Sequence, residues 1–326
     1  MRALPKDVYR QMAGNNRKLV GLILLFPVAL SAFVCLFLKL FEWIYYQEAT
    51  SNSVGAHYNV DPLITAENIV VILLYVVMIA CIMTLFSFLK GKDVILHLAG
   101  AKLCPDDKEH IKIYHAVENV ALAAGIPTPK VYLIQDKALN AFATGYSPQN
   151  AAITLTTGLV ERLEPLELEA VIAHEMGHIL NRDIRLNLFI ITGIGVIGLI
   201  GEMLLRIRFR SNGRSSRGKG NGLIIVVIAV GLALYLFRYF VAPFIHMAVS
   251  RTQEFQADAT SAFLTRNPQA LADALAKISE NPQVTRLQDT KEMAAMCIFS
   301  PLKRAAHLLD THPPIKDRIE RLEQMS

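Results

Sequence analysis

The sequence has few charged residues, few cysteines and no internal repeat. Charged residues occupy 19% of its 326 positions, against about 25% in an average soluble domain. Together with a hydrophobic content of 53%, this excludes a disordered protein, a collagen-like fibre and a coiled-coil rod. The four cysteines include no Cys-x-x-Cys pair, so we expect free thiols and no disulfide-stapled secreted scaffold. The net charge of +5 is mild, and the basic residues gather beside apolar runs, which argues against a nucleic-acid partner.

The hydrophobic surplus lies in four apolar runs. A helix of about 20 apolar residues spans the hydrocarbon core of a bilayer. The first two runs contain no charge, whereas Glu202 weakens the third, and Arg238 and Pro243 interrupt the fourth. The first run is too long for a signal-peptide core and has no small-x-small cleavage site after it, so we expect a retained span. The sequence therefore predicts about four transmembrane helices, at Leu19–Leu38, Ile69–Leu89, Leu186–Leu205 and Leu223–Val249.

The distribution of Lys and Arg predicts the orientation of the first two spans. Five basic residues precede the first run, none lies in residues 45–68, and three follow within residues 90–102. Because cytoplasmic flanks are enriched in Lys and Arg, we expect both ends of this hairpin in the cytoplasm. The second hairpin disagrees, since residues 206–219 at its tip carry six basic residues. Either the first hairpin determines the orientation of the whole chain, or the two weaker runs enter the membrane without crossing it.

One short motif predicts metal chemistry. His174, Glu175 and His178 form an HExxH sequence, and on a helix two residues four apart point to one side. Such a pair suits two zinc–nitrogen bonds, with Glu175 placed to hold and deprotonate a water. The pattern also occurs by chance, so the motif alone leaves open a helix with two partly buried histidines.

A second acidic motif supplies a candidate third ligand. A catalytic zinc takes three protein ligands and keeps one open position. Glu254 would be the third ligand, and Asp258, one helical turn later, can accept the outer N–H of a ligand histidine. The alternative is a solvated acidic helix face, but Phe255 and the alanines around it indicate a packed helix.

The membrane and metal predictions constrain each other. Between His178 and Glu254 lie 75 residues, most of them in the two weaker apolar runs. Ligands of one ion must meet on one side of the bilayer, so the chain between them must leave and return. Two runs of opposite direction achieve this, and they place the ion near the membrane surface.

Several motifs together resemble the HtpX-type integral-membrane zinc metallopeptidases, which are related to the CAAX prenyl-protein endoproteases. The resemblance extends over nearly the whole chain. It rests on LNAFATG at 139–145, AAITLTTGL at 151–159, AVIAHEMGHILNRD at 170–183, EFQAD at 254–258 and THPPIKDRIERL at 311–322.

The resemblance implies a role for each matching residue. His174, His178 and Glu254 would bind one Zn²⁺ per chain, with Glu175 as the general base. His312 and Arg318 would face the reacting carbonyl and stabilise the oxyanion. The alternative roles are a cap for the His before two prolines and a surface salt bridge for the Arg on a helix. The substrate would contact the strand that carries Asn140, Ala141 and Phe142.

The resemblance also implies function and location. We expect a multi-pass protein of the cell (inner) membrane whose active site faces the cytoplasm and which hydrolyses damaged or misfolded membrane proteins. One alternative is a dedicated processing protease of CAAX type, which typically has more spans. Another is a non-catalytic membrane scaffold with a structural zinc. Structural zinc prefers four ligands rich in cysteine, and no cysteine accompanies HEMGH.

The fold class expected is α+β, a mainly helical membrane protein with a zincin-like domain around a small edge-strand sheet. We expect four segments: a tail and membrane hairpin at 1–89, the first part of the protease domain at 90–185, a second hairpin at 186–249, and the second part at 250–326. The expected strands are 131–135, 140–144 and 151–156. One expected helix carries Ile113 to Ala124, and another begins at Pro165. A third runs from about Ser250 and stops before Asn267, and a last one follows Pro314. The Gly-x-Gly-x-x-Gly at 193–198 lies in an apolar run and indicates helix packing, not a dinucleotide site.

Overall fold

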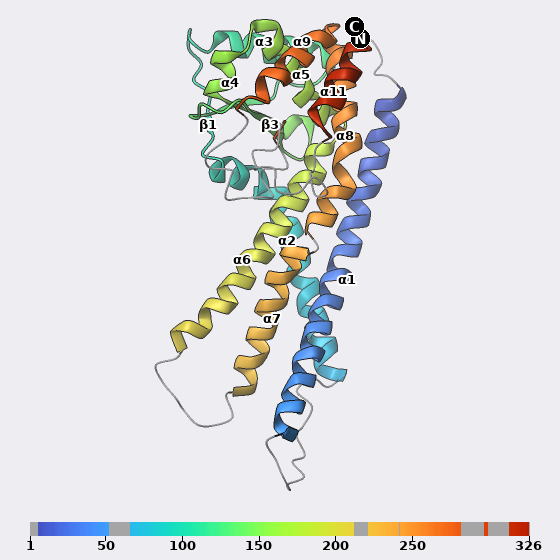
Figure 1. Ribbon diagram of the computed structural model, residues 1–326, viewed down its shortest axis with the longest axis vertical. Helices are drawn as coiled ribbons and strands as arrows, with labels where there is room; N and C mark the ends of the chain where they lie inside the picture. The colour runs from blue at the N-terminus through green and yellow to red at the C-terminus, as the bar shows by residue number, and fades with distance from the viewer. Residues whose placement is uncertain are drawn as a thin grey trace. The chain divides into compact units, whose positions relative to one another are not determined.

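A computed structural model describes most of the chain, and Figure 1 shows its elements. The chain divides into two compact units. Unit 1 comprises Met1–Val20, Phe86–Thr192 and Pro243–Ser326, and unit 2 comprises Gly21–Leu85 and Gly193–Ala242. The residues described are 6–51, 66–211, 221–240, 242–281, 297–298 and 313–325.

Unit 1 contains a mixed sheet of four strands in the order β1-β2-β4-β3. β2 (Lys130–Ile134) runs parallel to β4 (Ala152–Thr156), with Lys130 opposite Ala152. β3 (Ala141–Thr144) is antiparallel to β4, and the short β1 (Lys102–Leu103) is antiparallel to β2. β4 is buried at every position, which fits its apolar composition and central place.

Helices α3 (Ile111–Ala124), α4 (Thr157–Arg162), α5 (Pro165–Leu180) and α9 (Pro268–Ile278) enclose a continuous core with this sheet. α3 packs on α5, and α5 also contacts α9 and β3, as Figure 1 shows for unit 1. α3 ends at Gly125, whose φ of 68° is the left-handed conformation that glycine adopts without strain. α8 (Ala242–Thr265) and α11 (Ile315–Glu323) complete the unit, and α11 packs on α9.

Unit 2 is formed by apolar helices or parts of them, and the remaining residues of these helices belong to unit 1. α1 (Lys6–Ser51), α2 (Ala66–Leu98) and α6 (Asp183–Ser211) each contain a segment long and apolar enough to span a membrane. In the described part of the chain these segments are Ala13–Ile44, Leu74–Leu98 and Asp183–Arg206, and α7 (Asn221–Phe240) adds the shorter apolar segment Val227–Phe240. The protein is therefore an integral membrane protein, mainly helical, with three long apolar helices and one shorter one.

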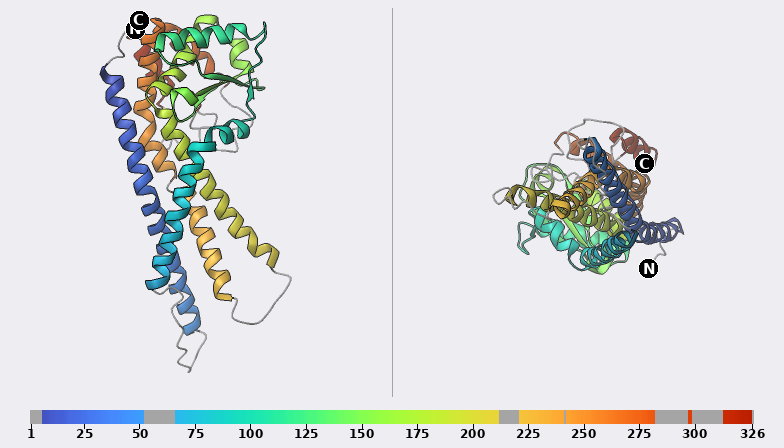
Figure 2. Two further views of the ribbon diagram at one scale, coloured as in Figure 1. Left: turned by 180° about the vertical axis from the view of Figure 1, so that it is seen from behind. Right: turned by 90° about the horizontal axis from the view of Figure 1, so that it is seen from below.

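Small residues allow α6 and α7 to approach each other within unit 2. A Cβ atom added to Gly201 of α6 would lie 2.9 Å from the backbone nitrogen of Tyr235 and 3.1 Å from the carbonyl oxygen of Gly231, both on α7. Figure 2 shows this pair of helices from behind. The glycine-rich stretch therefore lies within helix α6, as the sequence indicated, and its neighbour Gly201 makes the close helix contact.

Several expected elements are confirmed with small shifts in their ends. The three expected strands correspond to β2, β3 and β4, and all four cysteines are free thiols. Among the described residues, the fourth apolar run lies in two helices, since α7 ends at Phe240 and α8 begins at Ala242. The helix expected from about Ser250 thus begins earlier, inside the apolar run. The sequence prediction missed α4, α9 and the two-residue β1.

Candidate metal and catalytic site

Helix α5 places both motif histidines on one face. Its start is fixed by Pro165 in the first turn and by a capping box between Glu164 and Glu167, so the helical register of the motif is well defined. The His174 and His178 rings lie 4.8 Å apart between centroids and almost perpendicular, at 89°. Both side chains are buried inside unit 1.

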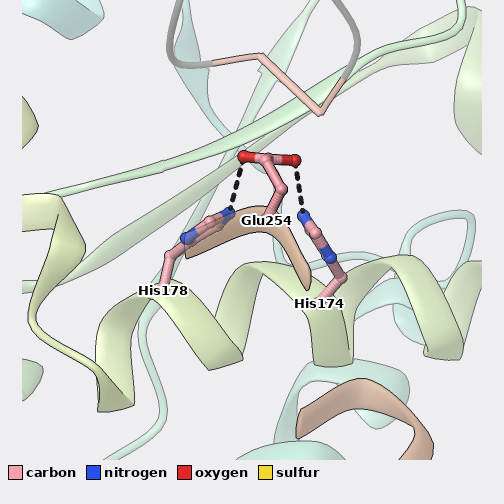
Figure 3. Close-up of side chains that lie close together, drawn as sticks. All are labelled: His174, His178 and Glu254. Atoms are coloured by element: carbon pink, nitrogen blue, oxygen red, sulfur yellow. Dashed lines mark ion pairs between the residues drawn. The ribbon is translucent and has the colours of Figure 1, made fainter. Parts of the chain in front are cut away.

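Helix α8 brings Glu254 to the two imidazoles. Its carboxylate lies 3.8 Å from Nε2 of His174 and 3.6 Å from Nε2 of His178, and Figure 3 shows both rings pointing at it. One ligand atom from each of the three residues lies within 4.8 Å of the others. Two atoms that each bind one zinc at about 2.1 Å are at most about 4.2 Å apart, so the imidazole–carboxylate distances fit a shared ion.

The chemistry of these donors also fits a metal ion. Nε2 of His174 is buried and has no hydrogen-bond partner among the described residues. A buried polar atom without a partner is costly, and a metal bond would satisfy it. Two imidazoles and a carboxylate are a ligand set that zinc prefers. The three residues can therefore hold one metal ion.

Gly177 allows α8 to approach α5 closely. A Cβ atom at this position would lie 3.0 Å from Cα of Ala257 and 3.2 Å from Cβ of Thr260. Ala257 is one helical turn after Glu254, so this contact sets the distance between the third ligand and the two histidines. The glycine of HEMGH is thus explained by helix packing beside the metal site.

The outer nitrogen of His174 contacts a buried ion pair. Its Nδ1 lies 2.9 Å from a carboxylate oxygen of Asp258. Arg318 of α11 bonds the same carboxylate through Nε at 2.9 Å and Nη2 at 2.6 Å, and its Nη1 lies 3.1 Å from Glu254. Arg318 is 1% exposed, so the alternative of a surface salt bridge does not describe it.

The outer nitrogen of His178 contacts a different partner. Its Nδ1 lies 3.0 Å from Oδ2 of Asp183, the first residue of α6. The other oxygen of Asp183 accepts a hydrogen bond from Asn15 of α1. Sequence reasoning missed both residues. Asp183 was detectable as a carboxylate one turn beyond HEMGH, whereas Asn15 belongs to no motif and lies 163 positions from His178.

In the metal-free protein, burial and neighbouring charges set the pKa values of the residues at this site. Burial and the charge of Glu254 raise the pKa of Glu175 to about 7, although His178, the Ala143 backbone N–H and Arg318 oppose the rise. Burial and the Arg318 cation lower the pKa of His174, against the opposing effect of Asp258.

The pKa values of His178 and Asp258 are shifted in other directions. Burial by itself would lower the pKa of His178, yet the hydrogen bond with Asp183 and the charge of Glu254 raise it to about 9. Burial by itself would raise the pKa of Asp258, but the Arg318 cation holds it below its ordinary value. One motif thus presents two imidazoles in opposite electrostatic settings.

The predicted substrate strand lies at an edge of the sheet. β3 pairs only with β4, so its outer edge has no strand partner among the elements described. The side chain of Asn140 turns back to accept the Ala141 N–H, and Phe142 is buried in a small apolar cluster with Cys297. The residues of the Asn-Ala-Phe motif are therefore all buried, and Ala141 presents its backbone carbonyl at this edge.

A two-residue segment contacts this edge. The N–H of Ile298 donates to the carbonyl of Ala141 at 2.9 Å, and the carbonyl of Ile298 accepts from Nη1 of Arg318 at 3.0 Å. Cys297 beside it is buried, and burial and the charge of Glu175 raise the pKa of its thiol. Sequence analysis found no role for this segment, since neither residue forms a motif. His312 lies outside the described residues.

Comparison with known proteins identifies the relatives of this chain. Residues 107–326 match the model of peptidase family M48. A protease HtpX homolog of Listeria innocua is 43% identical over 258 residues, covering 76% of this chain and 84% of that protein. A protease HtpX homolog of Bacteroides fragilis is 32% identical over 324 residues, covering 97% and 98% respectively.

Two further similarities complete the comparison. A protease HtpX homolog of Dictyoglomus thermophilum is 38% identical over 241 residues, which cover 74% of this chain and 77% of that protein. The crystal structure of S. mikatae Ste24p aligns with a TM-score of 0.44 at 23% identity, covering 94% of this chain and 67% of that chain.

Proposed function

This chain belongs to peptidase family M48 and is an HtpX homologue, and on that premise we propose that it hydrolyses damaged or misfolded membrane proteins at a single zinc site. The observation that carries the proposal is the convergence of His174, His178 and Glu254 on one point, beside the buried carboxyl of Glu175. Membership of the family makes polypeptides the substrate class. That these polypeptides are damaged membrane proteins is our proposal.

The three converging side chains would hold one Zn²⁺ per chain. Nε2 of each imidazole and the carboxylate of Glu254 are the donors, supported by the unpartnered Nε2 of His174. A zinc ion bound there supplies a Lewis acid for the substrate carbonyl and lowers the pKa of a water. Asp258 orients His174 through Nδ1, which fixes the tautomer that leaves Nε2 available.

Glu175 would act as the general base. Neither of its carboxylate oxygens forms a hydrogen bond with a described side chain, so the group is available to hold a water. Its buried carboxylate lies beside the metal-binding residues, where it would accept a proton from the attacking water and return it to the leaving amine nitrogen. Proton transfer of this kind contributes about 10²–10⁴-fold to a rate.

His312 and Arg318 would stabilise the oxyanion. The guanidinium of Arg318 already donates to the backbone carbonyl of Ile298 at 3.0 Å, beside the edge of β3. A substrate carbonyl held in the same position would receive the same donor. A well-aimed donor is worth about 3–4 kcal/mol when negative charge develops on the oxygen.

The substrate would bind as an extra strand along β3, where Asn140, Ala141 and Phe142 lie. The bond from the Ile298 N–H to the Ala141 carbonyl is the kind of bond that an added strand makes. A bound polypeptide would take this bond in place of Ile298. Because recognition then uses backbone groups, specificity would be broad, as degradation of misfolded proteins requires.

We place the protein in the cell (inner) membrane with its active site facing the cytoplasm. The excess of Lys and Arg at both ends of the first hairpin supports this orientation. A dedicated processing protease of CAAX type is the alternative enzyme. A non-catalytic scaffold is disfavoured, because no fourth His, Cys, Asp or Glu joins the donor group in the described part of the chain.

The proposal is tested by Glu175→Gln in purified protein, with an unfolded membrane protein as substrate. We expect zinc to stay bound while the rate falls by at least about 10²-fold. Undiminished cleavage would reject Glu175 as the base. A folded membrane protein and a prenylated CAAX peptide serve as comparison substrates, and preferential cleavage of the peptide would favour the processing protease.

A further inference from the structure

Asn15 of helix α1 is a buried polar residue far in sequence from the metal-binding motifs. It lies within unit 1 and outside residues 107–326, which match the family model. Its side chain is 3% exposed, and its Nδ2 donates to the carbonyl of Asn181 at 2.9 Å and to Oδ1 of Asp183 at 2.5 Å. A buried asparagine so placed has a structural or a functional reason to be polar.

The hydrogen bonds of Asn15 continue to the metal site through Asp183. Oδ2 of Asp183 contacts Nδ1 of His178, while Oδ1 accepts from Asn15. The carboxylate is fully buried and is held at both oxygens. A carboxylate held in this way keeps the proton of His178 on Nδ1, which directs Nε2 at the ion.

Asn15 also contacts the helix of the third ligand. Its Oδ1 lies 3.5 Å from Nε2 of Gln253, the residue before Glu254. Gln253 is 3% exposed, so this contact is shielded from water. One amide therefore joins the start of α6, which supports His178, to the part of α8 that supplies Glu254.

We propose that Asn15 is a positioning residue of the metal site, acting through Asp183 on His178. The proposal rests on the proposed zinc site of this chain. It makes helix α1 part of the metal centre in addition to a membrane segment. Asn15 touches neither the ion nor the substrate, so its effect is on the orientation of a ligand.

The test is the affinity of the purified full chain for Zn²⁺ alone, measured by competition with a chelator. We expect Asn15→Leu, which removes the amide while keeping the branched shape of the side chain, to weaken binding about 3–10-fold, and Asp183→Asn to weaken it about 10–100-fold. Asn16→Ala removes the same functional group from a neighbouring position that is only partly buried, and should leave the affinity unchanged.

The double variant separates positioning from general structure. If Asn15 acts through Asp183, then Asn15→Leu weakens zinc binding no further once Asp183 is Asn. The proposal would be overturned if the double variant bound zinc more weakly by the product of the two separate factors, or if Asn15→Leu bound zinc like the wild type. Should Asn15→Leu fail to fold, Asn15→Ser, which keeps a small polar group, is carried through the same cycle.

The readout also distinguishes this proposal from the proposed function. Zinc affinity is measured without a peptide substrate, so it is independent of catalysis. A wild-type protein that binds zinc tightly and cleaves nothing would reject the protease function and leave the role of Asn15 standing. A wild-type protein that cleaves its substrate, together with an unchanged zinc affinity in Asn15→Leu, would support the protease function and overturn the role of Asn15.

Discussion

The two ligand histidines lie one helical turn apart and have different supports. His174 contacts a carboxylate that is paired with a buried cation, Arg318. His178 contacts a carboxylate that is bonded to a neutral amide, Asn15. We call Asp258 with Arg318 the charged arm of the site, and Asp183 with Asn15 the neutral arm. The charged arm comes from the C-terminal part of the chain, and the neutral arm comes from the start of α6 and from the first helix.

This difference shows how one short motif depends on remote parts of the sequence. In the charged arm, Arg318 compensates Asp258 and Glu254, so removal of the cation leaves buried negative charge. In the neutral arm, removal of Asn15 leaves one buried acceptor without its donor. The charged arm should therefore contribute more to stability, and both arms should affect the metal.

Arg318→Leu is expected to have the largest effect. It leaves two buried carboxylates without their cation, which costs about 3–5 kcal/mol of the free energy of unfolding. The measurement is denaturant unfolding of the metal-free protein in detergent. The matched control is Arg321→Leu on the same helix. The exposed guanidinium of Arg321 lies 3.8 Å from the Phe255 ring, and its loss should cost no more than about 1 kcal/mol. Equal losses of stability in Arg318→Leu and Arg321→Leu would contradict the role of Arg318 as the compensating cation of the charged arm.

Glu175 lies between the two histidines in sequence and makes the stability of the metal-free protein depend on pH. Its pKa is about 7 in the folded state against an ordinary 4.5, so folding favours the protonated carboxyl. This contribution is fully present below about pH 4.5 and is lost as the pH rises to about 7, amounting to about 3 kcal/mol.

The check on this pH dependence is Glu175→Gln, which cannot lose the proton. Relative to the wild type, the variant should gain stability steadily between about pH 4.5 and pH 7. Unfolding curves at several pH values in the presence of a chelator measure the difference. A constant difference over this range would mean that the carboxyl is not perturbed by burial.

Gly177→Ala tests the spacing that both arms share. The added methyl group meets the backbone of α8 at Ala257, so we expect a loss of about 1–3 kcal/mol in stability and weaker zinc binding. Gly195→Ala is the matched control, because a Cβ atom there meets nothing within 4 Å. If both variants bind zinc like the wild type, the close approach of α8 is not required.

Asn15→Leu should have the smallest effect on stability. It leaves Oδ1 of Asp183 without the amide donor, at a cost of about 1–2 kcal/mol in the metal-free protein. Compared under the same conditions as Arg318→Leu, it measures the difference between the neutral and the charged arm. A loss as large as that of Arg318→Leu would remove the distinction.

The sequence predicted those features that local pattern determines. The HEMGH helix, the strands at the sheet and the Glu254 helix follow from periodicity, turn residues and short motifs, and the structure contains them all. Glu254 could be predicted as the third ligand because Asp258 follows it by one helical turn. These features depend on residues close together in the chain.

The missed features depend on contacts between distant residues. Asn15 meets Asp183 across 168 positions, and Ile298 meets Ala141 through backbone atoms that any residue carries. Neither contact leaves a pattern in one sequence. The amphipathic helix α9 was missed although its cap, Asn267 followed by Pro268, is a strong start signal.

The central claim is that His174, His178 and Glu254 hold one zinc ion together. Zinc content of the purified wild type and of Glu254→Gln, measured by elemental analysis after dialysis against a weak chelator, tests it most directly. The account predicts one zinc per wild-type chain and a large loss in the variant, since a catalytic zinc needs three protein ligands. Wild-type protein without stoichiometric metal, or a variant that retains it fully, would contradict the account.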